Sequence, residues 1–321
     1  MIIIPEREIA DLVSPADCLI AVEGVFASMA NRSAYNFPVI REAIGHADAL
    51  YGFKSGFDRD RLVLGLKSGG FWPRNVQRGL SNHQSTIFLF DADSGRCRAM
   101  LGGNLLTSLR TAAASAISIK YLARPKSKVI GMIGAGHQST FQLRAALDQR
   151  PFEKVVAWNI DPAMLARLEE VAREKDLPFE SVHLDQLGQE ADVIITITSS
   201  FKPILKASQV RPGTHIACMG TDTKGKQEVE PELLAEASVF ADEITQSSTI
   251  GEAQHAVQQG LIGRADIIEI GAVIRGDHFG RTDAEEITLF DGTGVGLQDL
   301  AVASAVVERA IAKGVAFEMD F

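Results

Sequence analysis

The stretch "GMIGAGHQS", Gly131 to Ser139, joins an apolar strand to a helix through two closely spaced glycines. Gly134 and Gly136 have the spacing of a dinucleotide-binding turn: the first makes the turn, and the second clears space for a pyrophosphate at the helix N-terminus. Ser139 takes the place of the third glycine, where close packing of helix on strand is needed, so a small serine should cost little. The pattern alone also fits a glycine-rich turn without a ligand.

The segments after this turn favour a parallel sheet covered by helices. Short apolar strands alternate with amphipathic helical segments, the strands being "KVIGMIG", "KVVAWN", "DVIITIT", "THIACMG", "SVFAD" and "IIEIG". This alternation is typical of doubly wound α/β folds. We therefore predict a Rossmann-type nucleotide-binding domain over residues 125–297.

Asp161, in "NIDP" at the end of the second of these strands, bears on the choice of cofactor. A carboxylate there accepts the adenine-ribose hydroxyls and repels a 2′-phosphate, which favours NAD(H) over NADP(H). Asp161 is also placed to cap the helix that begins at Pro162, and the two roles are compatible.

The first part of the chain is predicted to be a mixed α+β domain. Ser14, Pro15 and Asp17 mark the start of a helix over residues 14–32. Residues 61–101 have a strand pattern with a hairpin turn at "DADSG", and residues 105–123 form an alanine-rich helix that ends before Pro125. We expect a substrate and dimerisation domain over 1–124, completed by a C-terminal helix over 298–321.

Composition limits the partners. A length of 321 residues suits two domains, and no segment has the roughly 20 consecutive apolar residues of a membrane helix. A net charge of -9 disfavours nucleic acid and anionic membranes. The dispersed Cys18, Cys97 and Cys218 argue against disulfides, no metal site is expected, and the N-terminus lacks a signal-peptide layout, so we expect a cytoplasmic protein.

Three basic residues outside the nucleotide domain are candidate substrate ligands. Lys67 ends a strand that runs into glycines, so its amine points either into a cleft or into solvent. Arg110 is a lone arginine early in an apolar helix, which favours a cleft-facing guanidinium or an interface ion pair; Arg41 is a third candidate. Two or three converging cations would suit the carboxylate of an amino or keto acid.

Asp222 follows a strand of the predicted nucleotide domain, and ligands bind at the carboxyl ends of such strands. Its carboxyl group could exchange a proton with a substrate nitrogen. A turn-forming aspartate between Gly220 and Gly225 is the alternative, and spacing alone favours it.

Longer segments resemble the ornithine cyclodeaminase and mu-crystallin family over about residues 30 to 315. These segments are "TSLRTAAASAISIKYLARPKSKVIGMIGAGHQS", "GLKSGGFWPRN", "MGTDTKGKQEVEPELL" and "EEITLFDGTGVGLQDLAVA". The resemblance implies a homodimer of two-domain subunits with the active site between the domains. It implies that Lys67 lies near the substrate carbonyl or carboxylate, that Arg41 and Arg110 bind a carboxylate, and that Asp222 handles the nitrogen.

The resemblance also implies the cofactor contacts. The expected pyrophosphate turn comprises Gly134, Ala135, Gly136, His137 and Gln138, with Asp161 at the ribose and Arg110 and Gly220 as further contacts. Relatives that use NADPH tend to carry an arginine where this chain has Ile160, which again favours NAD(H).

The family includes ornithine cyclodeaminases, alanine dehydrogenases, ketimine reductases and ligand-binding crystallins. Two departures narrow the choice: "YGFKSGFD" stands where many members have "MP", which puts Lys54 close to the pocket, and Asp291 to Gly294 replace a usual "KSVG". Positive charge beside Arg41 favours a second substrate carboxylate over the ammonium of ornithine. The chain most resembles the branch that reduces iminosuccinate to aspartate, so we expect an NADH-dependent imine reductase with Lys67 and Asp222 as catalytic residues.

Overall fold

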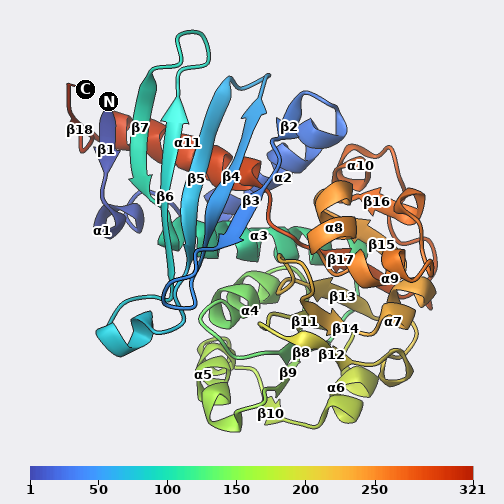
Figure 1. The fold of residues 1–321 in the computed structure, drawn as a ribbon. Helices are drawn as coiled ribbons and strands as arrows, with labels where there is room; N and C mark the ends of the chain where they lie inside the picture. The colour runs from blue at the N-terminus through green and yellow to red at the C-terminus, as the bar shows by residue number, and fades with distance from the viewer. Residues whose placement is uncertain (321) are drawn as a thin grey trace. The chain divides into compact units, whose positions relative to one another are not determined.

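The computed structural model describes residues 1–320, which form two compact units (Figure 1). Unit 1 comprises Met1–Arg110 and the segment that begins at Val295, and unit 2 comprises Thr111–Gly294. Helix α3 (Asn104–Leu122) contributes residues to both units, whereas the predicted junction lies after the helix, at residue 124. The functional boundary between domains stays a prediction.

Unit 1 contains a mixed sheet of eight strands in the order β18-β1-β7-β6-β5-β4-β2, with β3 also paired to β4. The strands are β1 (Ile2–Ile4), β2 (Ala34–Asn36), β3 (Ile40–Ala43), β4 (Leu50–Asp58), β5 (Val63–Phe71), β6 (His83–Phe90), β7 (Cys97–Gly102) and β18 (Phe317–Glu318). Strands β6 and β7 form the predicted hairpin, with Gly95 in the left-handed conformation at φ 73°. Strands β2 to β4 were not predicted, because Gly52 and Gly56 weaken the strand pattern.

The helices of unit 1 are α1 (Glu6–Ile9), α2 (Pro15–Ala30), the 3-10 turn η1 (Asn75–Arg78), the first part of α3 and α11 (Gly296–Lys313). The predicted start of α2 is confirmed: Ser14 and Asp17 form a capping box. Helix α11 packs against β4, β5 and α2. The predicted helix over 298–321 was too long, because Gly314, at φ 67°, ends α11 and residues 317–318 pair with β1.

The close approach of α11 to the sheet depends on glycines. A Cβ at Gly56 would lie 2.9 Å from Leu297 Cγ, and one at Gly65 would lie 2.9 Å from Leu300 Cδ2. On the helix itself, a Cβ at Gly296 would lie 2.7 Å from the backbone nitrogen of Ser55. Side chains at these positions would push the helix away from the sheet.

Unit 2 contains an eight-stranded, all-parallel sheet in the order β10-β9-β8-β11-β13-β17-β15-β16, which confirms the doubly wound fold. Its strands are β8 (Val129–Ile133), β9 (Lys154–Trp158), β10 (Phe179–Ser181), β11 (Val193–Thr196), β13 (His215–Cys218), β15 (Ser238–Ala241), β16 (Ile267–Glu269) and β17 (Thr288–Asp291). Strands β12 (Phe201–Leu205) and β14 (Gln227–Val229) form a separate pair. The strand order changes direction between β8 and β11, the usual place for a dinucleotide in this fold.

The helical segments of unit 2, besides the end of α3, are α4 (Ser139–Leu147), η2 (Pro162–Leu165), α5 (Ala166–Glu174), α6 (Leu184–Glu190), η3 (Ala207–Gln209), α7 (Pro231–Glu236), α8 (Ile244–Ile250), α9 (Gln254–Gln258), η4 (Arg264–Asp266) and α10 (Ile270–Arg275). The helix expected at Pro162 begins as the 3-10 turn η2 before α5. Among the helices of residues 1–320, none is both long and apolar enough to cross a membrane.

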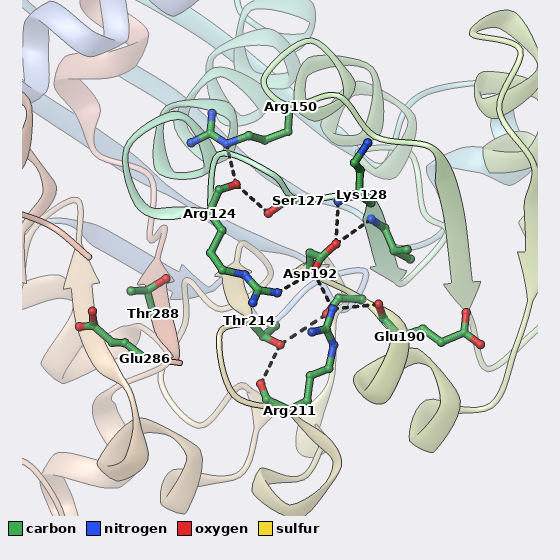
Figure 2. A network of polar contacts seen from close by, with 12 residues as sticks. Arg124, Ser127, Lys128, Arg150, Glu190, Asp192, Arg211, Thr214, Glu286 and Thr288 are labelled. Atoms are coloured by element: carbon green, nitrogen blue, oxygen red, sulfur yellow. Dashed lines mark hydrogen bonds and ion pairs between the residues drawn. The ribbon is translucent and has the colours of Figure 1, made fainter. Parts of the chain in front are cut away.

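A polar network centred on Asp192 fixes the edge of this sheet where β8 and β11 begin (Figure 2). Its carboxylate accepts hydrogen bonds from Arg124 Nη2 at 2.7 Å and Arg211 Nη2 at 2.6 Å. It also accepts from the backbone nitrogens of Lys128 and Val129, at 2.6 and 3.0 Å. The glycine turn follows β8, so this network secures the edge opposite the one expected to bind a ligand.

Candidate active site

The predicted site residues fall into two groups, one in each unit. Unit 1 holds the basic residues Arg41, Lys54, Lys67 and Arg110. Unit 2 holds the others, which are Gly134, Ala135, Gly136, His137, Gln138, Asp161, Gly220 and Asp222.

Lys67 and Arg110 share a buried carboxylate in unit 1. Lys67 Nζ lies 2.9 Å from Asp299 Oδ1 and 2.8 Å from Oδ2, and Arg110 Nε donates to Asp299 Oδ1 at 3.0 Å. Lys67 Nζ also donates to Thr107 Oγ1 at 3.2 Å, and Arg110 Nη1 donates to Gln298 Oε1 at 3.0 Å. Lys67 is therefore not a solvated lysine, and both cations are held in fixed directions by partners on α3 and α11.

Burial and charge set the protonation of this cluster. Burial lowers the pKa of Lys67 to about 7; Asp299 counteracts the shift, whereas Arg110 and Lys54 add to it. Burial alone would raise the pKa of Asp299, but the charges of Arg110 and Lys67 hold it below its ordinary value. Asp299 is thus an ionised counter-ion, and Lys67 titrates close to neutral pH.

Sheet register places the other two cations on the same face as Lys67. Lys54 on β4 pairs directly with Lys67 on β5, and Arg41 on β3 pairs with Gly52 on β4, two positions from Lys54. Lys54 is buried and its charge acts on both Lys67 and Asp299. Four cations therefore lie on or beside one face of the unit 1 sheet, which suits an anionic ligand.

Three further residues of this cluster were not predicted from the sequence: Asp299, Gln298 and His83. His83 begins β6 opposite Phe71, on the same face as Lys67. Burial, followed by the charges of Lys67 and Arg110, lowers the pKa of His83 to about 3, so its imidazole is neutral. An available signal for Asp299 was a lone acidic residue within the apolar pattern of "VGLQDLAVA".

In unit 2, the glycine turn has the shape that a dinucleotide needs. Gly134 has φ 104°, and a Cβ there would lie 2.5 Å from the carbonyl oxygen of Ile197, so only glycine fits. A Cβ at Gly136 would meet no atom within 4 Å, which leaves open space at the start of α4. Buried Ser139 fills the third position and donates from Oγ to the Gly136 carbonyl at 2.7 Å. These residues fit a pyrophosphate at the helix N-terminus.

Asn159 links this turn to the predicted ribose acid. Its Oδ1 accepts from the backbone nitrogen of Ala135 at 3.1 Å, and its Nδ2 donates to the carbonyl of Asp161 at 2.7 Å. Asp161 Oδ1 accepts from the Ala163 nitrogen at 3.1 Å, so the helix-capping role is present. Asp161 is exposed, and the neighbouring Ile160 side chain is 88% exposed.

Asp222 lies in the loop between β13 and β14, partly buried, and pairs with Lys226 Nζ at 3.0 Å. Lys226 Nζ also donates to the Gly220 carbonyl at 3.2 Å, and Gly225 takes the left-handed conformation with φ 86°. The turn expected around Asp222 is present. His137 and Gln138 lie directly after Gly136, with His137 exposed and Gln138 partly buried.

The ornithine cyclodeaminase/mu-crystallin family model matches residues 6–314. The chain is 63% identical to the iminosuccinate reductase of Paracoccus denitrificans over all of both chains, and the structure of that enzyme with NAD+ matches with a TM-score of 0.96, covering 100% of this chain and 99% of the other. A dimeric archaeal alanine dehydrogenase with bound NAD is 33% identical, covers 100% and 99% of the two chains, and has a TM-score of 0.93. The Δ1-pyrroline-2-carboxylate reductase of Thermococcus litoralis, solved with NADH and L-proline, is 26% identical over 99% and 100% of the chains, also with a TM-score of 0.93.

These matches extend over the basic cluster of unit 1 and the glycine turn of unit 2, and not over the nucleotide fold alone. The chain belongs to the ornithine cyclodeaminase/mu-crystallin family.

Proposed function

We propose that this protein is an NADH-dependent imine reductase that converts iminosuccinate to aspartate in the cytoplasm. The observation that carries the proposal is the cluster of Arg41, Lys54, Lys67 and Arg110 on or beside one face of the unit 1 sheet. A cluster of four cations suits a substrate with two carboxylates better than one with an additional ammonium group. The relative that is 63% identical is an iminosuccinate reductase, and the unpaired cysteines suit a reducing compartment.

In the proposed reaction, NADH supplies the hydride that reduces the imine carbon, and it leaves as NAD+. Arg41, Lys67 and Arg110 bind one carboxylate and orient the carbon, and Lys54 binds the second. Asp222, directly or through a water molecule, delivers the proton that the nitrogen takes up as the C=N bond becomes a C–N bond. Asp299 keeps Lys67 and Arg110 fixed, and its charge opposes the fall in the pKa of Lys67 that burial causes.

The test follows NADH absorbance with three substrate sets. Oxaloacetate plus ammonium provides the imino dicarboxylate, pyruvate plus ammonium provides the imino monocarboxylate, and ornithine tests cyclodeamination. We expect rapid oxidation of NADH with the first set and slower oxidation with the second. No oxidation with the first set at high ammonium would reject the substrate, and release of ammonia from ornithine without net change in NADH would support the cyclodeaminase instead.

Cofactor choice is expected to depend on the residues after β9. The double change Ile160→Arg and Asp161→Ser adds a cation for a 2′-phosphate and removes the carboxylate that repels it. A charge-assisted contact of this kind contributes about 1.5–3 kcal/mol, so the ratio of kcat/KM for NADPH to that for NADH should rise about 10- to 150-fold. Steady-state kinetics with both cofactors measures the ratio. An unchanged ratio in a folded variant would show that the adenine ribose does not contact this position.

The outer face of the unit 1 sheet supports a proposed homodimer. Ile40 on β3 lies opposite Phe53 on β4, and Tyr35 on β2 lies opposite Phe57, which gives an apolar surface with Ile40 53%, Phe53 38% and Tyr35 43% exposed. We propose that a second copy of the chain covers it, since the archaeal alanine dehydrogenase, 33% identical, is a dimer.

Phe53→Asp should therefore dissociate the dimer, because it places a charge within an apolar contact. Light scattering coupled to size-exclusion chromatography gives the mass. Phe279→Asp is the matched control, since Phe279 is 93% exposed and lies in unit 2. If Phe53→Asp keeps the wild-type mass, the dimer uses another surface.

A further inference from the structure

Two buried glutamates of unit 2 have no part in the reaction proposed above. Glu228 lies on β14, and Glu252 lies between α8 and α9. Both side chains are almost completely shielded from solvent, at 0% and 1% exposure. Burying a carboxyl group costs free energy of folding unless the group is hydrogen-bonded. The hydrogen-bond partners of these two glutamates therefore indicate what they hold in place.

Glu228 joins the ends of two neighbouring strands. Its Oε2 accepts from Thr196 Oγ1 at 2.7 Å and from the Gly220 nitrogen at 2.8 Å, and its Oε1 accepts from the Thr198 nitrogen at 2.6 Å. Thr196 ends β11 and Gly220 follows β13, which pairs with β11. Burial raises the pKa of Glu228, and the hydrogen bonds from these partners oppose that shift. Because all three partners donate, the arrangement fits an ionised carboxylate.

Glu252 holds the next residue of the same loop. Its Oε1 accepts from the backbone nitrogens of Glu228 and Val229, both at 2.8 Å, and its Oε2 lies 2.5 Å from Thr221 Oγ1. Burial, and then the charge of Glu228, raise the pKa of Glu252 to about 8. Its protonated Oε2 can then donate to the threonine hydroxyl, while Oε1 accepts both N–H groups.

The peptide between these two carboxyl groups has little freedom. A Cβ at Gly220 would lie 2.4 Å from the Thr198 carbonyl and 2.5 Å from Glu228 Oε1, so the backbone packs directly on its support. Gly220 is held by Glu228 and Thr221 by Glu252, and Asp222 is the next residue. The support therefore reaches the residue immediately before Asp222.

We propose that Glu228 and Glu252 are positioning residues that fix the Gly220–Thr221 peptide and, through it, the carboxyl group of Asp222. The inference rests on the proposed function for the role of Asp222 as proton donor. It also explains why residue 220 is a glycine, since a Cβ there would collide with the Glu228 carboxyl group. The loop lies at the carboxyl ends of β11 and β13, the edge where this fold binds its dinucleotide, so the same support shapes the cofactor site.

The test compares Glu228→Gln with Glu252→Gln. At Glu228 an amide keeps one acceptor oxygen and turns its NH2 group toward one or two of the three donors. We therefore expect kcat to fall about 10- to 100-fold and the Kd for NADH to rise, from the loss of one or two hydrogen bonds to a charged group. At Glu252 an amide reproduces the protonated carboxyl, with an oxygen toward the two backbone nitrogens and an N–H toward Thr221. Glu232→Gln, an exposed site on α7, is the matched control.

The pH dependence of NADH binding, measured by fluorescence, separates positioning from general stability. In the wild type, Glu252 ionises above about pH 8 and faces the charge of Glu228, so the Kd for NADH should rise there. Glu252→Gln should abolish that rise. The other groups near the pair do not mimic it: burial raises the pKa of Cys218 well above its ordinary value, and burial raises that of Asp291 to about 7, below this range.

A folded Glu228→Gln variant with the wild-type kcat and Kd would overturn the proposal, as would an alkaline rise in Kd that persists in Glu252→Gln. If Glu228→Gln does not fold, the pH profile of Glu252→Gln decides alone. Asp222→Asn tests the underlying function separately: full activity in that variant would reject the proton-donor role, whatever the two glutamate variants do.

Discussion

Replacing Asp299 with asparagine should lower kcat/KM for the imino dicarboxylate about 10²- to 10⁴-fold, since removal of one member of a buried ion pair costs about 3–5 kcal/mol. Asp299 is completely buried and contacts both Lys67 and Arg110. Without its charge the two cations repel each other, and the Lys67 ammonium loses the interaction that opposes its desolvation. Lys67 would then be neutral over most of the working pH range and would bind a carboxylate poorly.

The pH profile of substrate binding provides the specific readout for this change. In the wild type, the lowered pKa of Lys67 leaves the ammonium charged below about pH 7 and neutral above it, so the affinity for an unreactive dicarboxylate should fall as the pH rises through 7. In Asp299→Asn that fall should move to lower pH. Titration calorimetry with succinate measures it.

Glu308→Gln supplies the control for Asp299→Asn, because it makes the same chemical change at an exposed position of the same helix. Melting temperatures of both variants show whether the helix still packs. A loss of activity in Asp299→Asn without any displacement of the pH profile would mean that Asp299 acts only by holding α11 in place.

Replacing Lys54 with methionine should separate substrates with two carboxylates from those with one. A methionine keeps most of the apolar volume of this buried side chain and removes its charge. We expect kcat/KM for the imine of oxaloacetate to fall about 10- to 150-fold, which corresponds to one lost hydrogen bond to a charged group. Turnover of the imine of pyruvate should change little, because that substrate has no second carboxylate for Lys54 to bind.

The two imines are compared in parallel by NADH absorbance, with exposed Lys126→Met as the control for the substitution. Equal losses with both imines would show that Lys54 does not select the second carboxylate. A gain with the pyruvate imine alone would agree with relief of the repulsion between Lys54 and Lys67.

The nucleotide fold was predictable because it depends on local patterns. Strands such as β8 and β11 are short, continuous apolar runs separated by helices, and the Gly134 turn is a local sequence feature. Strand β4 was not predicted because its buried face carries Gly52 and Gly56. Glycine is needed at these positions because the backbone of Ile40 and the side chain of Leu297, which lie elsewhere in the sequence of unit 1, pack against them. No local pattern predicts such contacts.

The candidate site also has residues that local sequence predicts and residues that only the tertiary structure brings together. Lys67 and Arg110 were conspicuous because each is a charge in an apolar or glycine-rich setting. Their pairing through Asp299 was not predictable, because it depends on how a helix near the end of the chain packs on a strand near its beginning. His83 was missed for a related reason: only the register of β5 with β6 brings it onto the face of Lys67.

The origin of α11 from the end of the chain determines the order in which the protein can be completed during synthesis. Unit 2 is contained in residues 111–294, so its whole sequence is synthesised before that of α11. Unit 1 must wait, with Lys67 lacking its counter-ion and the glycine surfaces of β4 and β5 uncovered, until Gly296–Lys313 has been made. A nascent chain that stops at Gly294 therefore contains the whole sequence of unit 2, whereas the sheet of unit 1 still lacks the helix that packs on it.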